Sequence, residues 1–158
     1  MMDQTELIEK IRAHPGQELI EISSPRERRI FVSVKPENLI KTIRLLKDDF
    51  GFYHVSTISG VDKISCFEIL YHLASRSASL TVRVEIDRNN PEVQSICGVI
   101  PGAILYEREI QDMFGIKIIN IPDPRPLVLP DDWPENNYPL RKDWSFQPPE
   151  EKIPGEKE

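Results

Sequence analysis

The sequence predicts an α+β fold: a compact α/β domain over residues 1–115, with a mixed or antiparallel sheet and helices packed on it, and then a proline-rich extended arm over residues 116–158. Some segments carry apolar residues at helical spacing and others alternate apolar with polar residues. Five prolines precede Gly115 and nine follow it. Each proline removes a backbone donor and restricts the preceding residue, so the arm does not resemble a helix or a central strand.

Four helices are expected in the domain. The first spans residues 5–13. The second begins at Pro36, because proline suits the first helical position, and ends at Gly51 in the usual C-terminal manner. Its apolar residues recur every three or four positions and form one face. The remaining two helices are expected over residues 91–99 and 102–114.

Five strands are expected around these helices. The clearest alternation in the chain covers residues 80–87, which favours a strand with one buried face. Turns are expected at residues 23–25 and 75–77. The expected strands cover residues 18–22, 29–34, 52–58, 67–73 and 80–87.

Charge and hydropathy exclude several classes of protein. The net charge is −6, whereas nucleic-acid binding needs a basic face to neutralise phosphates. No apolar run approaches the roughly 20 residues that span a bilayer. The first residues are polar and acidic, unlike a secretory signal, so a cytoplasmic location is expected.

No catalytic, cofactor-binding or metal-ligating residue is expected in this chain. Cys66 and Cys97 are its two cysteines, whereas an iron–sulfur cluster usually needs four thiolates and a structural zinc four close cysteine or histidine ligands. His72 falls on the polar phase of its strand, which favours a half-exposed sheet residue. No glycine-rich phosphate loop is present.

The helix over residues 102–114 carries a charged face that allows three interpretations. Arg108 and Asp112 are four residues apart, and Glu109 lies on the same side. The pattern alone favours a solvated face. The alternatives are a contact with a partner protein and a small hydrolase that uses Glu109 and Asp112 as an acid/base pair, which would also need a pocket and a shifted pKa.

The composition of the arm favours a docking function. A disordered acidic tail would contain few large apolar side chains, yet this arm carries Trp133, Tyr138 and Trp144 among its prolines. Aromatic residues interleaved with arginine are typical of protein–protein anchors. Prolines lower the entropy lost when an extended segment is ordered on a partner.

Two motifs resemble one known family. Residues 106–116 read YEREIQDMFGI and residues 139–143 read PLRKD. Both resemble motifs of the 30 kDa subunit of respiratory complex I, also called the C subunit of NADH-quinone oxidoreductase, and residues 59–62 (SGVD) fit as well. Residues 121–125 read IPDPR where the family usually has a His-Pro-Asp-Leu-Arg stretch, which puts a role for that histidine in doubt here. Residues 129–134 (LPDDWP) are similar to the versions in energy-converting membrane-bound [NiFe] hydrogenases.

The resemblance implies a cofactor-free structural subunit in the cytoplasmic arm of a membrane-bound, ion-pumping oxidoreductase. Its partners would be a large subunit with a quinone site or a [NiFe] centre and a small iron–sulfur subunit, and its membrane contact would be peripheral and indirect. Electrons would pass in those partners from NADH, ferredoxin or a similar donor to quinone, protons or another acceptor. The hydrogenase-type branch is favoured over the 30 kDa subunit of a true respiratory complex I, and a free-standing adaptor domain is a further alternative.

The same resemblance places a charged network at a contact between subunits. The residues expected there come from the end of the domain and from the arm. They are Glu107, Arg108, Glu109, Asp112, Gly115, Asp123, Arg125, Trp133, Tyr138, Pro139, Leu140, Arg141, Lys142, Asp143 and Trp144.

Overall fold

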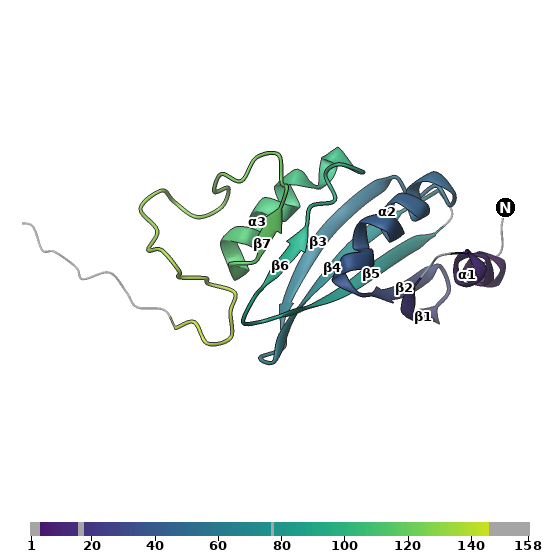
Figure 1. Ribbon diagram of the computed structural model, residues 1–158, viewed down its shortest axis with the longest axis horizontal. Coiled ribbons are helices and arrows are strands. Elements are labelled where there is room, and N and C mark those ends of the chain that lie inside the picture. Colours follow the sequence, from purple (N-terminus) through teal and green to yellow (C-terminus); the bar gives the residue numbers. More distant parts are fainter. Residues whose placement is uncertain (1–3, 16–17, 77, 146–158) are drawn as a thin grey trace, which may run out of the picture.

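The computed structural model describes residues 4–15, 18–76 and 78–145. It confirms the predicted α+β class, because helices pack on a five-stranded mixed sheet and a two-stranded sheet lies beside it (Figure 1). The elements in chain order are α1 (Gln4–Ala13), β1 (Leu19–Arg26), β2 (Arg29–Val34), α2 (Leu39–Asp48), β3 (His54–Asp62), β4 (Cys66–Ala74), β5 (Ser79–Asp87), β6 (Glu92–Gln94), α3 (Ile104–Phe114) and β7 (Lys117–Ile119).

The large sheet has the strand order β1-β2-β5-β4-β3. Its neighbouring strands are antiparallel except β2 and β5, which run parallel. The alternation predicted for β5 is confirmed, since every second residue faces the core. The buried residues of that strand on this face are Leu80, Val82, Val84 and Ile86.

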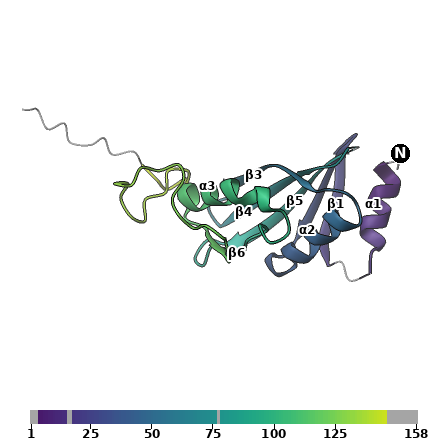
Figure 2. The ribbon, with the colours of Figure 1, turned by 90° about the horizontal axis from the view of Figure 1, so that it is seen from above.

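The three helices lie at different places along the sheet. Figures 1 and 2 both show α1 at the β1 end of the molecule and α3 at the opposite end, with α2 between them. Leu39, Ile43 and Leu46 of α2 are completely buried, as the helical spacing predicted. A 3₁₀ turn, Pro36–Asn38, leads into α2, and Gly51 follows its end at φ 73°.

The helix predicted over residues 91–99 is wrong. Residues 92–94 form β6 instead, and β6 pairs in parallel with β7. The N–H of Lys117 donates to the Pro91 carbonyl at 2.8 Å, so the pairing depends on residues more than twenty positions apart. Proline at the start of this segment favours a helix locally, but the distant strand decides its conformation.

The turn predicted at residues 23–25 is also wrong. Strand β1 continues to Arg26, and the register with β2 shifts between Ser23 and Arg26. This irregularity accommodates Pro25, which sits on an edge strand where a missing backbone donor is tolerated. The chain turns at Glu27 and Arg28, and Arg28 has φ 62°.

Two smaller predictions concern residues 72 and 75–77. His72 is half-buried, as predicted, and its Nδ1 lies 3.0 Å from Thr81 Oγ1. Burial lowers the pKa of His72. Between β4 and β5 the N–H of Ser75 donates to the Ala78 carbonyl at 3.0 Å, which closes the predicted turn, although Ser77 lies outside the described residues.

The segment after α3 begins with β7, within the range assigned to the arm. Residues 120–145 contain no helix or strand in the part that the structure describes, and they turn repeatedly. Residues 146–158 of the predicted arm lie outside the described residues. The position of residues 120–145 therefore depends on their contacts with the domain.

Candidate docking site

Glu107 forms a buried polar cluster at the start of α3. Glu107 is 1% exposed, and its carboxylate accepts hydrogen bonds from Ser95 Oγ at 2.6 Å, the N–H of Ile96 at 2.7 Å and Cys97 Sγ at 3.2 Å. Burial raises the pKa of Glu107 even though these three donors act to lower it. Burial likewise raises the pKa of Cys97 to about 11, so this thiol is not activated as a nucleophile.

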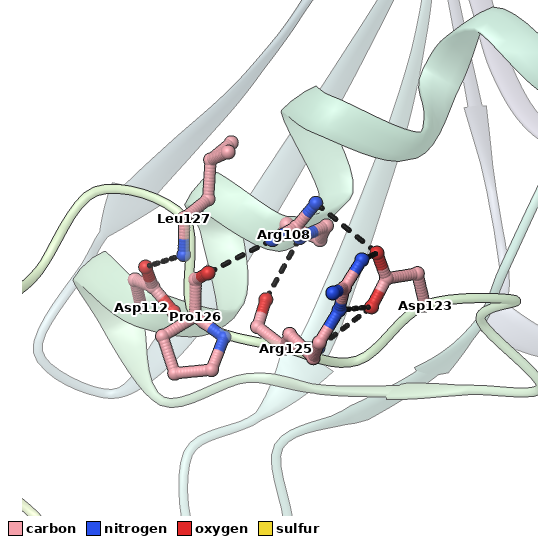
Figure 3. Close-up of polar contacts among 6 residues, drawn as sticks. All are labelled: Arg108, Asp112, Asp123, Arg125, Pro126 and Leu127. Atoms are coloured by element: carbon pink, nitrogen blue, oxygen red, sulfur yellow. Dashed lines mark hydrogen bonds and ion pairs between the residues drawn. The ribbon is translucent and has the colours of Figure 1, made fainter. Parts of the chain in front are cut away.

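Arg108 and Asp112, one turn apart on α3, hold the first part of the arm (Figure 3). Arg108 donates from Nε to the Arg125 carbonyl at 2.7 Å and from Nη2 to the Pro126 carbonyl at 2.8 Å. Asp112 Oδ2 accepts the N–H groups of Leu127 at 2.7 Å and Val128 at 2.8 Å. These two side chains therefore satisfy backbone groups of a segment that has no regular structure of its own.

Asp123 adds an ion pair to this cluster. Its carboxylate accepts two hydrogen bonds from the Arg125 guanidinium, both at 2.7 Å, and lies 3.3 Å from Arg108 Nη1. The hydrogen bonds from Arg125 lower the pKa of Asp123 well below its usual range. Arg108 thus contacts the arm through both carbonyls and a carboxylate, as Figure 3 shows.

A second cluster holds the arm around residues 139–143. The buried carboxylate of Asp62, at the end of β3, accepts the N–H of Lys142 at 2.9 Å, the N–H of Ile64 at 2.7 Å and the Arg88 guanidinium. Arg88 Nη2 also lies 3.0 Å from an Asp143 oxygen. Burial raises the pKa of Asp62, but the donated hydrogen bonds outweigh it and the pKa is lowered.

The end of α3 supplies the backbone partners of the same segment. Leu140 donates its N–H to the Met113 carbonyl at 3.1 Å, and Arg141 Nε donates to the Phe114 carbonyl at 2.7 Å. The Arg141 guanidinium lies 4.4 Å from the Tyr138 ring centroid, within cation–π distance. Carbonyls at a helix C-terminus lack helical partners, so these donors both cap α3 and fix the arm.

Gly115 ends α3 in the left-handed conformation, with φ 64°. Its N–H donates to the Gln111 carbonyl at 2.9 Å. A Cβ at this position would overlap the Tyr138 ring. Glycine is therefore required here twice, once for the backbone conformation and once for the close approach of the arm.

The structure joins the two motifs that carry the resemblance. Arg108, Asp112 and Gly115 contact the arm directly. The Glu107 carboxylate lies inside the domain. The remaining predicted residues divide by exposure: Glu109, Leu140, Lys142 and Asp143 are exposed, whereas Trp133, Pro139 and Trp144 are half-buried.

Sequence reasoning missed Asp62 and Arg88 as residues that position the arm. Asp62 belongs to the motif of residues 59–62. That motif contributed to the family resemblance, but no role was predicted for any of its residues. Arg88 follows β5, and no sequence pattern around it predicts its contact with Asp143. The Arg88 guanidinium also lies 4.8 Å from the Phe67 ring centroid, a contact that only the fold brings about.

The cluster around Asp112 has the geometry of a structural brace. Glu109 is exposed, and one Asp112 oxygen accepts backbone N–H groups of the arm. An acid/base pair would need both carboxylates beside a substrate pocket. Among residues 4–15, 18–76 and 78–145, no group of three or more histidine, cysteine, aspartate or glutamate side chains is arranged to hold a metal ion.

No helix in the described part of the chain has the length and apolarity to cross a membrane. The longest of the described helices, α3, has 11 residues. A helix of that length extends about 16 Å, whereas the hydrocarbon core of a bilayer is about 30 Å thick.

Comparison with known proteins identifies relatives in several redox complexes. The chain is 34% identical over 149 residues to the C subunit of NADH-quinone oxidoreductase from Roseiflexus sp., covering 90% of this chain and 84% of that protein. It is 32% identical over 151 residues to the C subunit of F(420)H(2) dehydrogenase from Methanosarcina mazei, covering 93% and 95%. It is 39% identical over 121 residues to formate hydrogenlyase subunit 5 of Escherichia coli, covering 73% of this chain but 21% of that longer protein.

The fold has a close counterpart among solved structures. A chain of the membrane-bound sulfane sulfur reductase, an archaeal respiratory membrane complex, superposes with a TM-score of 0.78 at 26% identity and covers 90% of this chain and 85% of that one. Residues 32–150 match the family described as respiratory-chain NADH dehydrogenase, 30 kDa subunit. The chain belongs to this family of complex I 30 kDa subunits, which confirms the resemblance carried by residues 106–116 and 139–143.

Proposed function

We propose that this chain is a cofactor-free assembly subunit of a membrane-bound, ion-pumping oxidoreductase related to complex I. The observation that carries the proposal is the braced arm. Arg108 donates hydrogen bonds to the arm, and Asp112 and Asp62 accept hydrogen bonds from it. Holding the arm therefore explains these three side chains without the chemistry of a redox site. An arm held in a defined course loses less entropy on docking than a free one.

The proposed partners are the large subunit, which carries a quinone site or a [NiFe] centre, and the small iron–sulfur subunit. Iron–sulfur clusters and any nickel would then belong to those partners, and this chain would sit at the cytoplasmic side of the membrane through them. Relatives in NADH-quinone oxidoreductase, F(420)H(2) dehydrogenase and membrane-bound sulfane sulfur reductase support a role in such complexes.

The hydrogenase-type branch is the favoured version of this proposal. Two relatives support it: formate hydrogenlyase subunit 5, and hydrogenase-4 component G of Escherichia coli at 36% identity over 100 residues. The sequence LPDDWP at residues 129–134 points the same way. The 30 kDa subunit of a true respiratory complex I is the alternative, which the 34% identity to the Roseiflexus protein supports.

Purification through an affinity tag on this chain tests the proposal. From membranes of the native host in mild detergent, we expect the large and small subunits to co-purify in fixed proportion, and the complex to contain iron. The isolated chain should contain none and show no visible absorption band. Nickel in the complex would select the hydrogenase branch. Stoichiometric iron in the isolated chain, or a chain that purifies without these subunits, would contradict the proposal.

A further inference from the structure

The arm exposes two adjacent apolar side chains where its backbone is bound by Arg108 and Asp112. Leu127 is 40% exposed and Val128 is 51% exposed. Their N–H groups both donate to Asp112 Oδ2, at 2.7 and 2.8 Å. Immediately before them, Arg108 binds two carbonyls, those of residues 125 and 126. We call residues 125–128 the tip of the arm. Arg108 binds the carbonyl groups of its first two residues and Asp112 binds the N–H groups of its last two, while the side chains of Leu127 and Val128 contact solvent.

This arrangement is not explained by the folding of the domain. Burial of apolar side chains stabilises a fold, but the side chains of Leu127 and Val128 remain largely outside the core. Polar side chains of α3 instead hold the backbone that presents them. Figure 3 shows Arg108 and Asp112 reaching from α3 to this segment. Rigid presentation of exposed apolar groups is what lowers the entropy cost of association.

Helix α3 carries a further exposed apolar side chain on the side that holds the arm. Leu105 is 54% exposed, and it precedes Arg108 by three residues and Asp112 by seven. Residues at these spacings lie on the same side of a helix. Leu105 therefore lies on the side of α3 that carries both braces of the tip. Isolated exposed apolar residues are ordinary, but grouped ones mark interaction surfaces.

Acidic side chains follow Leu127 and Val128 along the arm. Asp131, Asp132 and Glu135 follow the tip within eight residues, and all three are exposed. The exposed Arg125, just before Leu127, is paired with Asp123 at 2.7 Å, so the acidic residues remain in excess. Two copies of this surface would therefore bring like charges together, which disfavours self-association. A recess lined by apolar residues and rimmed by lysine or arginine would complement it.

We propose that Leu127 and Val128 form a preorganised apolar anchor that inserts into such a basic-rimmed recess on a partner subunit of the same complex. The inference rests on the proposed function, since it names the surface through which assembly occurs. Arg108 and Asp112 are positioning residues in it: they contact the arm of their own chain and set the place of the anchor. The anchor itself provides the apolar contact.

The test replaces both anchor side chains in the tagged full-length chain, in its native host. L127S/V128S removes apolar area without adding charge, and L127E/V128E adds charge that a recess would exclude. We expect the amount of partner subunits recovered per tagged chain to fall about tenfold or more for both, as for residues at the centre of an interface. The isolated variants should unfold at the temperature of the wild type, because both side chains are exposed.

Ile20 and Tyr53 provide the matched control. They are 65% and 55% exposed and lie away from the arm, so I20E/Y53E adds the same two charges elsewhere. This control should recover partner subunits at the wild-type level. A photo-crosslinking amino acid at position 127 should attach to a subunit of the complex, in an apolar segment flanked by lysine or arginine.

Three results would overturn the inference. The first is recovery of partner subunits by L127S/V128S at the level of I20E/Y53E. The second is a dimer of the isolated wild-type chain in sedimentation that L127S/V128S abolishes, which would make the anchor a self-association surface. The third is a wild-type chain that recovers no partner subunit at all, and that result would refute the proposed function as well.

Discussion

Replacing Glu107 with alanine is expected to lower the free energy of unfolding by about 3 kcal/mol. The substitution leaves the Ser95 hydroxyl and the Ile96 N–H buried without their acceptor, and each buried donor without a partner costs about 1–3 kcal/mol. Ser95 and Ile96 are themselves buried, so water does not readily replace the carboxylate. Denaturant unfolding followed by circular dichroism measures this loss.

Glu109→Ala is the matched control for this prediction. Glu109 lies two residues further along α3 and is exposed, so its loss should change the free energy of unfolding by less than about 0.5 kcal/mol.

The pKa of Glu107 is raised above its usual 4.5. The part of its contribution to stability that is linked to protonation is therefore fully present below pH 4.5 and declines as the pH rises through the raised pKa. Equal losses of unfolding free energy for Glu107→Ala and Glu109→Ala would show that the buried hydrogen bonds of Glu107 do not stabilise the fold.

Replacing Gly115 with alanine is expected to destabilise the chain by about 3 kcal/mol and to displace residue 138. An alanine at φ 64° costs roughly 1–2 kcal/mol for the left-handed backbone alone. Its Cβ would also overlap the Tyr138 ring, and overpacking typically costs about 1–3 kcal/mol. If the ring moves away, the hydrogen bonds from Leu140 and Arg141 to the end of α3 are lost with it.

Gly51→Ala separates these two contributions. Gly51 also has a positive φ, 73°, but a Cβ there meets no atom within 4 Å. It should therefore cost only about 1–2 kcal/mol, for the backbone. Limited proteolysis should cleave residues 120–145 faster in G115A than in G51A. Equal stability and equal cleavage in both variants would mean that the approach of Tyr138 to Gly115 does not hold the arm.

Local patterns predicted the parts of the fold that depend on local structure. The alternation of residues 80–87 and the apolar face of α2 reappear in the structure because each element buries one face against the core. The helix predicted over residues 91–99 was wrong for a physical reason. Three residues are too few for a period to emerge, and their strand exists only because β7 pairs with it.

Most residues of the candidate site could be predicted from the sequence, but the roles of Asp62 and Arg88 and the contacts that join the two motifs could not. The motifs at residues 106–116 and 139–143 identified the segments, yet no periodicity indicates that the first binds the second within the same chain. The residues that donate hydrogen bonds to Glu107 come from positions 95–97, ten or more residues before it, and no helical spacing predicts them. Arg88 reaches Asp62 and Asp143 only because the fold brings the ends of β3 and β5 beside the arm.

The most direct test of the docking function is the composition of the complex formed by a chain that ends at Asn120. This truncation keeps β7 and its pairing with β6, and removes every residue that Arg108, Asp112 and Asp62 hold in the arm. The ratio of partner subunits to tagged chain would be measured by quantitative mass spectrometry, with the amount of chain in the cell as reference. We predict a chain that is present but recovers few or no partner subunits. A complex with full stoichiometry and the stability of the wild type would contradict a docking function for the arm.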